Sequence, residues 1–280
     1  AWKWVARPFK EYTDRYDSIT VNDYLETRFR DNSHILRIIG TIIILSMVTA
    51  YTAAQLTASG KAFNSFLGTD YTTGVTIGAL VIVFYTTIGG FKAVAYSDLI
   101  QGILMFGCLF LLPITGIMAI GGWSSFIENL RLEDPSLLAL MGSGGLTLSS
   151  MISALGFVAI GFAFLGSPQL LTRFMAARSQ TDIVKGARIA IPCILVFDIG
   201  AVFAGMAGRV LFPALTDPET ILPMMSMDLF PSLITGLFLV TVLAAIMSTV
   251  DSLLILASAS VVRDIIQQTL KLAIGERKLS

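Results

Sequence analysis

The sequence has little charge, a single histidine and two cysteines. Only 14% of its 280 residues are Asp, Glu, Lys or Arg, whereas about 25% is usual in soluble proteins. Hydrophobic residues make up 55% of the chain, and a water-soluble domain of this length needs more polar surface. The composition therefore argues strongly against a soluble enzyme, and it excludes a disordered chain and a disulfide scaffold. It predicts a membrane protein.

The scarcity of charge and of metal-binding residues also limits the partners. The formal net charge is zero, which argues against nucleic acid, because nucleic-acid binding usually needs a basic surface. Cys108 and Cys193 lie in apolar runs and are not expected to form a disulfide. With His34 as the one histidine, a transition-metal site is not expected either. No catalytic motif or phosphate loop is present, so we expect no enzyme activity and no cofactor.

Six apolar stretches are long enough to cross a bilayer core of about 30 Å, which takes roughly 20 helical residues. They lie at 38–60, 72–91, 97–120, 144–168, 187–211 and 232–257. These runs lack the ten-residue alternation of barrel strands, so helices are expected. We therefore predict an all-α, polytopic membrane helix bundle that forms one transmembrane domain over 1–280.

The basic residues fall mainly on one side of these six spans. Sixteen of the 19 Lys and Arg residues lie in the segments 1–37, 92–96, 169–188 and 258–280. The other side has Lys61, Arg131 and Arg209. By the positive-inside rule, both ends of the chain are expected to be cytoplasmic, in a plasma (inner) membrane. The chain begins without Met and has no signal-peptide pattern, so we interpret it as a fragment of a longer protein.

The last span carries hydroxyl groups on one face. At 3.6 residues per turn, Ala245, Ser248, Thr249 and Ser252 share a stripe, and Asp251 lies beside it. A hard monovalent cation such as Na⁺ prefers several oxygen ligands of this kind. Alternatively, the hydroxyls bond back to their own helix and simply let helices approach closely. The residues alone leave both interpretations open.

Two further acids stand out in the apolar spans. Asp98 begins the third span, where it either complements the helix dipole or forms a charged element of an ion path. Asp198 lies in the middle of the fifth span without a basic residue within a turn or two. An acid at that depth must be protonated, paired or facing water. Asp198 is thus a candidate proton or polar site, or a neutral acid bonded to a neighbouring helix.

The end of the fourth span contains helix-breaking residues. Gly161 and Pro168 bracket a run with aromatic neighbours. Such residues can break a helix and free its carbonyls, a device of transporter binding sites, and the aromatic rings could contact an organic solute. The proline could equally just end the helix.

Several stretches of the chain resemble the sodium/solute symporter family. The matching segments are 35–39, 85–94, 97–101, 173–177 and 244–249. The Tyr-Thr-x-x-Gly-Gly-Phe-x-Ala run and the Met-Ser-Thr run are specific together, and the likeness extends nearly end to end. The resemblance implies a core of five-plus-five inverted-repeat helices similar to the leucine-transporter fold. This chain would supply the third to eighth core helices.

The resemblance also implies cation sites. Ala245, Ser248 and Thr249 match half of the family's sodium site, and the other half would come from the first core helix. Asp98 matches the family's aspartate that is important for sodium coupling. Asp251 and Ser252 fall where some members have a second sodium ion.

A solute pocket is implied as well, with departures from the family pattern. Tyr51 and Pro168 match residues that line the pocket. Ile160 and Phe164 stand where proline-transporting members have Trp and Tyr, and Asp198 replaces an apolar residue. These changes leave the sodium residues intact and make the identity of the solute the open question.

The expected function is sodium-coupled symport of a small organic solute, with proline or a related amino acid as the first candidate. The partners would be that solute, Na⁺ as coupling ion and the lipid bilayer, and the oligomeric state is not determined. Alternatives are another solute (a small carboxylate, pantothenate or a sugar), proton coupling through Asp198, or a symporter-like membrane sensor domain.

Overall fold

A computed structural model describes residues 2, 4–139 and 141–272 of the chain. In this part of the chain all regular structure is helical. The α-helices are α1 (Ala6–Arg15), α2 (Val21–Phe29), α3 (Ile35–Leu67), α4 (Tyr71–Ala119), α5 (Trp123–Glu133), α6 (Leu148–Ala163), α7 (Pro168–Ala176), α8 (Gln180–Leu211), α9 (Ile221–Leu229) and α10 (Ser232–Ala259). The short 3₁₀ turns are η1 (Pro135–Leu138), η2 (Gly142–Gly144), η3 (Phe164–Gly166) and η4 (Pro218–Thr220), and a π-helix, η5 (Ser260–Thr269), continues α10. The all-α prediction is confirmed.

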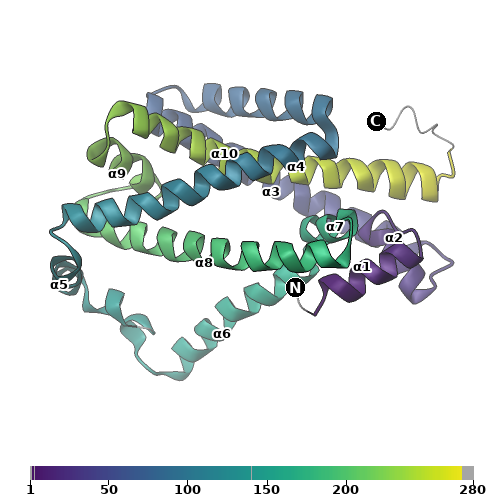
Figure 1. Cartoon of the computed structure of the whole chain (residues 1–280), viewed down its shortest axis with the longest axis horizontal. Coiled ribbons are helices and arrows are strands. Elements are labelled where there is room, and N and C mark those ends of the chain that lie inside the picture. Colours follow the sequence, from purple (N-terminus) through teal and green to yellow (C-terminus); the bar gives the residue numbers. More distant parts are fainter. Residues whose placement is uncertain (1, 3, 140, 273–280) are drawn as a thin grey trace.

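Within the described residues, five helices are long and apolar enough to cross a membrane: α3, α4, α6 with η3, α8, and α10 with η5. The spans predicted at 72–91 and 97–120 both belong to α4, whose chain turns back on itself (Figure 1). Helices α3, α8 and α10 extend beyond the spans predicted for them. Hydropathy identifies the length that suits a bilayer and not the residue at which a helix ends, which explains the difference.

The turn within α4 occurs at Gly90. Its φ of 57° and ψ of −164° fall in a region that is almost restricted to glycine. The sequence places the connection between the second and third crossings at 92–96, whereas these residues are helical and the chain turns just before them. The two arms of α4, 71–89 and 91–119, therefore meet at a sharp corner.

The fourth crossing ends in a break, as its Gly and Pro residues suggest. Helix α6 stops at Ala163, the η3 turn follows, and Ser167 is non-helical with a ψ of 116°. Pro168 then occupies the first turn of α7, where its missing N–H costs nothing. The break gives α7 a direction of its own beside α1 (Figure 1).

Helix α10 lies at the centre and packs against α3 and α4, and α4 packs against α8. The α4–α8 contact is close, because a Cβ added at Gly200 would lie 2.2 Å from the Leu109 carbonyl oxygen. Small residues allow such an approach between membrane helices. At one end of the bundle, Leu112, Phe126 and Met225 are fully buried in a cluster that joins α4, α5, α8 and α9.

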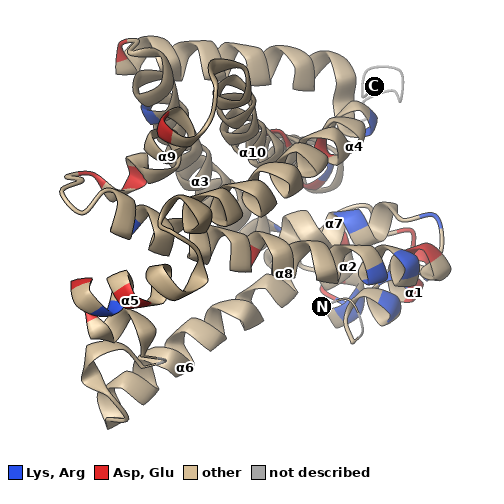
Figure 2. Cartoon of the chain, turned by 60° about the vertical axis from the view of Figure 1, so that its left-hand side comes forward, with Lys and Arg blue, Asp and Glu red and all other residues tan. Residues whose placement is uncertain are grey.

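The opposite end of the bundle carries α1, α2 and α7, and most of the charged residues in Figure 2 gather there. We call it the charged end. Helix α2 has a reciprocal cap at its start: the Thr20 hydroxyl accepts from the Asp23 amide, and the Asp23 carboxylate accepts from the Thr20 amide.

The capped helix α2 belongs to a buried ionic cluster at the charged end. The Arg37 side chain, only 4% exposed, donates to Asp23 at 2.7 Å, to Asp264 at 2.8 Å and to Glu26 at 2.7 Å. Burial by itself would raise the pKa of Asp23, but its contacts with Arg37 hold that pKa below the usual range. The cluster connects α2 to the start of α3 and to η5 at the end of α10.

Candidate functional site

Three helices bring charged side chains together inside the apolar bundle. Arg173 on α7 donates through Nη2 to Oδ2 of Asp98 on α4, at 2.6 Å, and to the hydroxyl of Ser252 on α10, at 2.5 Å. Asp98 is mostly buried, with a side-chain exposure of 17%. A buried carboxylate needs such a partner, because removing a charge from water is costly. The break before α7 is what allows Arg173 to approach α4 and α10.

Asp251 completes the same cluster from α10. It is fully buried and accepts a hydrogen bond from the hydroxyl of Tyr85 on the first arm of α4. Ser252 donates to the Ser248 carbonyl at 2.8 Å and lies 3.3 Å from Oδ1 of Asp251. The predicted coupling residues Asp98, Asp251 and Ser252 therefore lie close together, connected by Arg173. We call Asp98, Arg173, Asp251, Ser252 and Tyr85 the polar cluster.

Helix α4 also carries oxygen atoms that have no partner. Among the described residues, nothing hydrogen-bonds to Oδ1 of Asp98, Oε1 of Gln101 or Oγ1 of Thr86, although all three atoms are buried. Leaving a buried polar atom unpaired costs about 1–3 kcal/mol. Oxygen atoms in this condition are suited to accept from water or to bind a cation.

The predicted sodium residues form one turn of α10. The hydroxyls of Ser248 and Thr249 donate to the Ala245 carbonyl, at 3.1 and 3.0 Å. In the structure, both hydroxyls therefore hydrogen-bond back to their own helix, as the alternative interpretation of this stripe expects. It does not remove their ability to bind a cation, because a hydroxyl that donates its hydrogen keeps its oxygen lone pairs. Both residues are half-buried.

The predicted solute residues are less tightly grouped. Tyr51 on α3, Ile160 on α6 and Phe164 on η3 are exposed, and Pro168 is half-buried at the start of α7. Helix α6 contacts mainly the η2 and η3 turns at its own ends and stands apart from the bundle in Figures 1 and 2. The structure does not bring Tyr51 against Ile160 or Phe164.

Asp198 lies on an exposed face of α8. Among the described residues it forms no ion pair and no side-chain hydrogen bond. The structure therefore does not join Asp198 to the polar cluster.

The chain as a whole matches one family description. The model of the sodium:solute symporter family covers residues 1–280. The chain belongs to the sodium:solute symporter family. Its apolar helices and its relatives support a multi-pass membrane protein.

Two relatives within this symporter family carry proline in their names. The chain is 35% identical to the high-affinity proline transporter PutP of Bacillus subtilis (strain 168), over 99% of this chain and 59% of that protein. It is 34% identical to a sodium/proline symporter of Staphylococcus aureus, over 98% of this chain and 53% of that protein. The chain thus spans about half to three-fifths of the relatives' length.

A solved structure shares the symporter fold. It is a substrate-bound, outward-open state of a Na⁺-coupled sialic acid symporter. The TM-score is 0.77 at 21% identity, over 99% of this chain and 59% of that one. This likeness confirms the leucine-transporter-like helical fold expected from the sequence.

Two members of the polar cluster were not identified as site residues from the symporter motifs. Arg173 and Tyr85 both lie in the segments that resemble the family, 173–177 and 85–94, but no role was inferred for them. The sequence does contain one indication of a role for Arg173, because this basic residue lies close to the helix-breaking Pro168. Its partners come from α4 and α10, which are 75 and 79 residues away in the chain, so only the fold could identify them.

Proposed function

We propose that the intact protein containing this chain couples the entry of Na⁺ to the uptake of a small organic solute, with proline or a related amino acid as the first candidate. Family membership supports a symporter, and the names of the two relatives support proline. The observation that carries the proposal is the convergence of oxygen-bearing side chains from α4 and α10 within apolar helices. Polar groups at such depth are costly and are usually functional.

In this proposal the α10 turn supplies half of a sodium site. Ala245, Ser248 and Thr249 present a carbonyl and two hydroxyl oxygens on one face, and the first core helix of the fold would supply the remaining ligands. Asp98, Asp251 and Ser252 are the coupling residues or a second cation site. The sialic acid symporter, which shares this fold, was described with a novel Na⁺ site.

The proposed transport cycle depends on the positive charge that Na⁺ carries across the membrane. Na⁺ binds between the first and eighth core helices and favours the outward-open state, after which the solute enters a pocket near the midplane. The bundle then rocks and both are released inside. The membrane potential contributes about 2.3 kcal/mol per charge per 100 mV, and the Na⁺ gradient adds to it.

The solute pocket would be lined by Tyr51, Ile160, Phe164 and Pro168, and Ile160 and Phe164 would determine which solute is bound. Both ends of the chain face the cytoplasm in this arrangement.

Uptake by the purified intact protein in proteoliposomes tests the proposal. We expect accumulation of one solute from a panel of proline, other amino acids, small carboxylates, pantothenate and sugars. Replacing Na⁺ by choline at fixed pH should abolish that accumulation. Undiminished uptake in choline would contradict sodium coupling. If that uptake were then driven by a pH gradient and lost in Asp198→Asn, it would support the proton alternative.

The ion pair of the polar cluster gives a second expectation. Replacing Arg173 by Gln leaves the Asp98 carboxylate buried without a counter-charge, which costs several kcal/mol. We expect the maximal uptake rate to fall at least about tenfold, and Asp98→Asn in the Arg173→Gln background to restore part of the lost stability but not Na⁺-coupled uptake. The control is Arg178→Gln, an exposed residue of the adjoining segment, which should transport normally. An Arg173→Gln protein with normal uptake would show that the pair is dispensable.

A further inference from the structure

One nitrogen atom of Arg173 lies where two helices present oxygen atoms to each other. Its Nη2 is 2.6 Å from Oδ2 of Asp98 on α4 and 2.5 Å from the hydroxyl oxygen of Ser252 on α10. A hard cation such as Ca²⁺ keeps about 2.3–2.6 Å to its oxygen ligands. The end of the Arg173 side chain therefore takes a position, between a carboxylate and a hydroxyl, that also suits a small cation.

The polar cluster contains more acidic than basic groups. Against two carboxylates, Asp98 and Asp251, it holds one guanidinium, that of Arg173. Neither carboxylate forms an ion pair with any other residue that the structure describes, and Oδ1 of Asp98 has no hydrogen-bond partner there. A buried carboxylate is costly without a cation beside it. Asp98 must therefore either keep Arg173 or bind another cation in its place.

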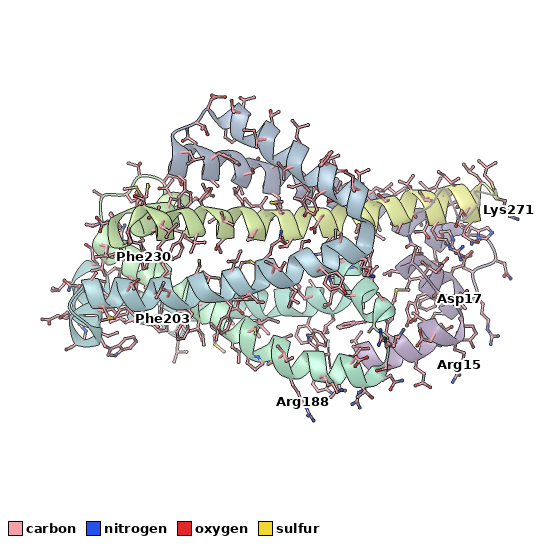
Figure 3. All side chains as sticks on the ribbon, turned by 45° about the horizontal axis from the view of Figure 1, so that its top comes forward. Arg15, Asp17, Arg188, Phe203, Phe230 and Lys271 are labelled. Carbon is pink, nitrogen blue, oxygen red and sulfur yellow. The ribbon has the colours of Figure 1, made fainter. Side chains whose placement is uncertain are left out.

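The Arg173 side chain has a way out of this position. It is 37% exposed, and a long basic side chain readily extends its charged end toward water. Helix α7 packs against α1 and α2 at the charged end. Figure 3 shows this end, with Arg15 and Asp17, opposite the one that carries Phe203. A displaced guanidinium would therefore lie toward the charged end and not among the apolar helices.

Helix α7 itself is held in place while its arginine side chain is partly exposed. Phe174 is 2% exposed, and its ring packs edge-on against that of Trp2, with 4.9 Å between the ring centroids. The Lys10 ammonium group donates to the Met175 carbonyl at 2.8 Å. A change in the side-chain conformation of Arg173 is thus sufficient to free the position beside Asp98.

We propose that Arg173 is the internal counter-ion of the unloaded protein: its guanidinium occupies the cation position beside Asp98 and Ser252 when no Na⁺ is bound there, and Na⁺ replaces it on loading. The inference rests on the proposed function and deepens it. Arg173 is a positioning residue and not a ligand of Na⁺. Because the two cations share one position, each lowers the occupancy of the other. Arg173 keeps the Asp98 carboxylate paired while the unloaded bundle rocks back.

Net uptake and exchange depend differently on such a counter-ion. In net uptake the protein must return without Na⁺, so Asp98 needs Arg173 during that step. In exchange of labelled for unlabelled solute, with Na⁺ and solute saturating on both faces, the protein stays loaded throughout. A counter-ion therefore matters for net uptake alone, whereas an ion pair that only holds the fold together matters for both.

The test compares the two modes with the intact protein in proteoliposomes. In Arg173→Gln, net uptake should fall at least about tenfold, while exchange keeps at least about half of its rate. The Na⁺ concentration for half-maximal exchange should fall about threefold to tenfold, because no side chain competes with Na⁺. Arg173→Lys retains the positive charge and should give an intermediate net uptake. The control is Arg178→Gln, an exposed residue beyond α7, which should leave both modes unaltered.

Chemical rescue separates the charge of Arg173 from its packing. Arg173→Cys, in a background whose other cysteines are replaced, should lose net uptake. An aminoethyl thiol reagent, which attaches an ammonium group through a mixed disulfide, should restore at least about a third of it. A neutral hydroxyethyl reagent of similar size should restore none.

Two results would overturn the counter-ion while leaving sodium coupling intact. One is a fall of net uptake and exchange by the same factor in Arg173→Gln, and the other is an equal effect of the two thiol reagents on Arg173→Cys. Loss of Na⁺ dependence in the unaltered protein would instead contradict the proposed function itself.

Discussion

Replacing both Ser248 and Thr249 by alanine should raise the Na⁺ concentration needed for half-maximal uptake by at least about tenfold. Each substitution removes one hydroxyl oxygen from the turn that begins at Ala245. A lost hydrogen-bond-like contact to a charged group costs about 1.5–3 kcal/mol, and about 1.4 kcal/mol corresponds to a factor of ten. The measurement is initial solute uptake by the intact protein as a function of Na⁺ at constant ionic strength.

The same helix offers a matched control for this experiment. Ser258 lies on α10, is exposed, and bonds back to the Leu254 carbonyl at 2.8 Å, just as Thr249 bonds to Ala245. Ser258→Ala therefore removes a hydroxyl with the same local geometry away from the site, and it should leave the Na⁺ requirement unchanged. If the double variant behaved like Ser258→Ala, the back-bonds would be the whole role of Ser248 and Thr249, and their proposed role in a sodium site would be refuted.

The helical bundle was predictable because hydropathy reports the apolar length directly. The corner of α4 shows the limit of that signal. Residues 92–96 contain Lys92 and separate two apolar runs, so a loop was the reasonable expectation there. The chain turns instead at Gly90, whose dihedral angles are not helical. Because Gly89 precedes it directly, the sequence does not indicate which of the two glycines forms the corner.

Spacing alone predicted the candidate site only where its residues share one helix, and Asp98 on α4 was identified from the family resemblance. Ser248, Thr249 and Ser252 follow from the period of α10, and their neighbour Asp251 follows from the sequence itself. The contacts of Arg173 and Tyr85 depend instead on the break before α7 and on the corner of α4. Of the solute residues, Tyr51 lies on α3, whereas Ile160 and Phe164 lie on α6 and on the adjoining η3 turn. Which residues of such elements form one pocket depends on tertiary packing, and the spacing of residues along the sequence does not predict it.

The ionic cluster around Arg37 illustrates the same point. In the sequence, Arg37 is one of several basic residues in the segment 1–37, and it bears only on the predicted orientation of the chain in the membrane. In the structure its side chain is nearly buried, at 4% exposure, and Asp264 beside it is fully buried at 0%. Asp264 lies 227 residues further along the chain. Thr20 and Asn22 also donate to its carboxylate, each at 2.7 Å. Helix α10, which carries Ser248 and Thr249, is thereby connected through η5 at its end to α2 and α3.

Replacing Arg37 by Gln should therefore destabilise the protein by about 3–5 kcal/mol, the usual cost of removing one partner from a buried ion pair. Asp23, Glu26 and Asp264 would be left together, with Arg263 at 3.2 Å from Asp23 and the His34 ring against Glu26 as their basic neighbours. The measurement is the free energy of unfolding of the intact protein in mixed micelles, at neutral pH. Arg15→Gln is the control: its 3.5 Å pair with Glu11 is exposed, and such pairs contribute about 0–1 kcal/mol.

A companion variant separates charge from packing. Asp264→Asn in the Arg37→Gln background removes the most buried of the stranded carboxylates while keeping one of the two acceptor oxygens that Thr20 and Asn22 use. It should recover part of the lost stability, because the remaining cost of Arg37→Gln is then mainly lost packing and hydrogen bonds. An Arg37→Gln protein as stable as Arg15→Gln would mean that the three carboxylates take up protons or water at little cost. The cluster would then not be what fixes the end of α10.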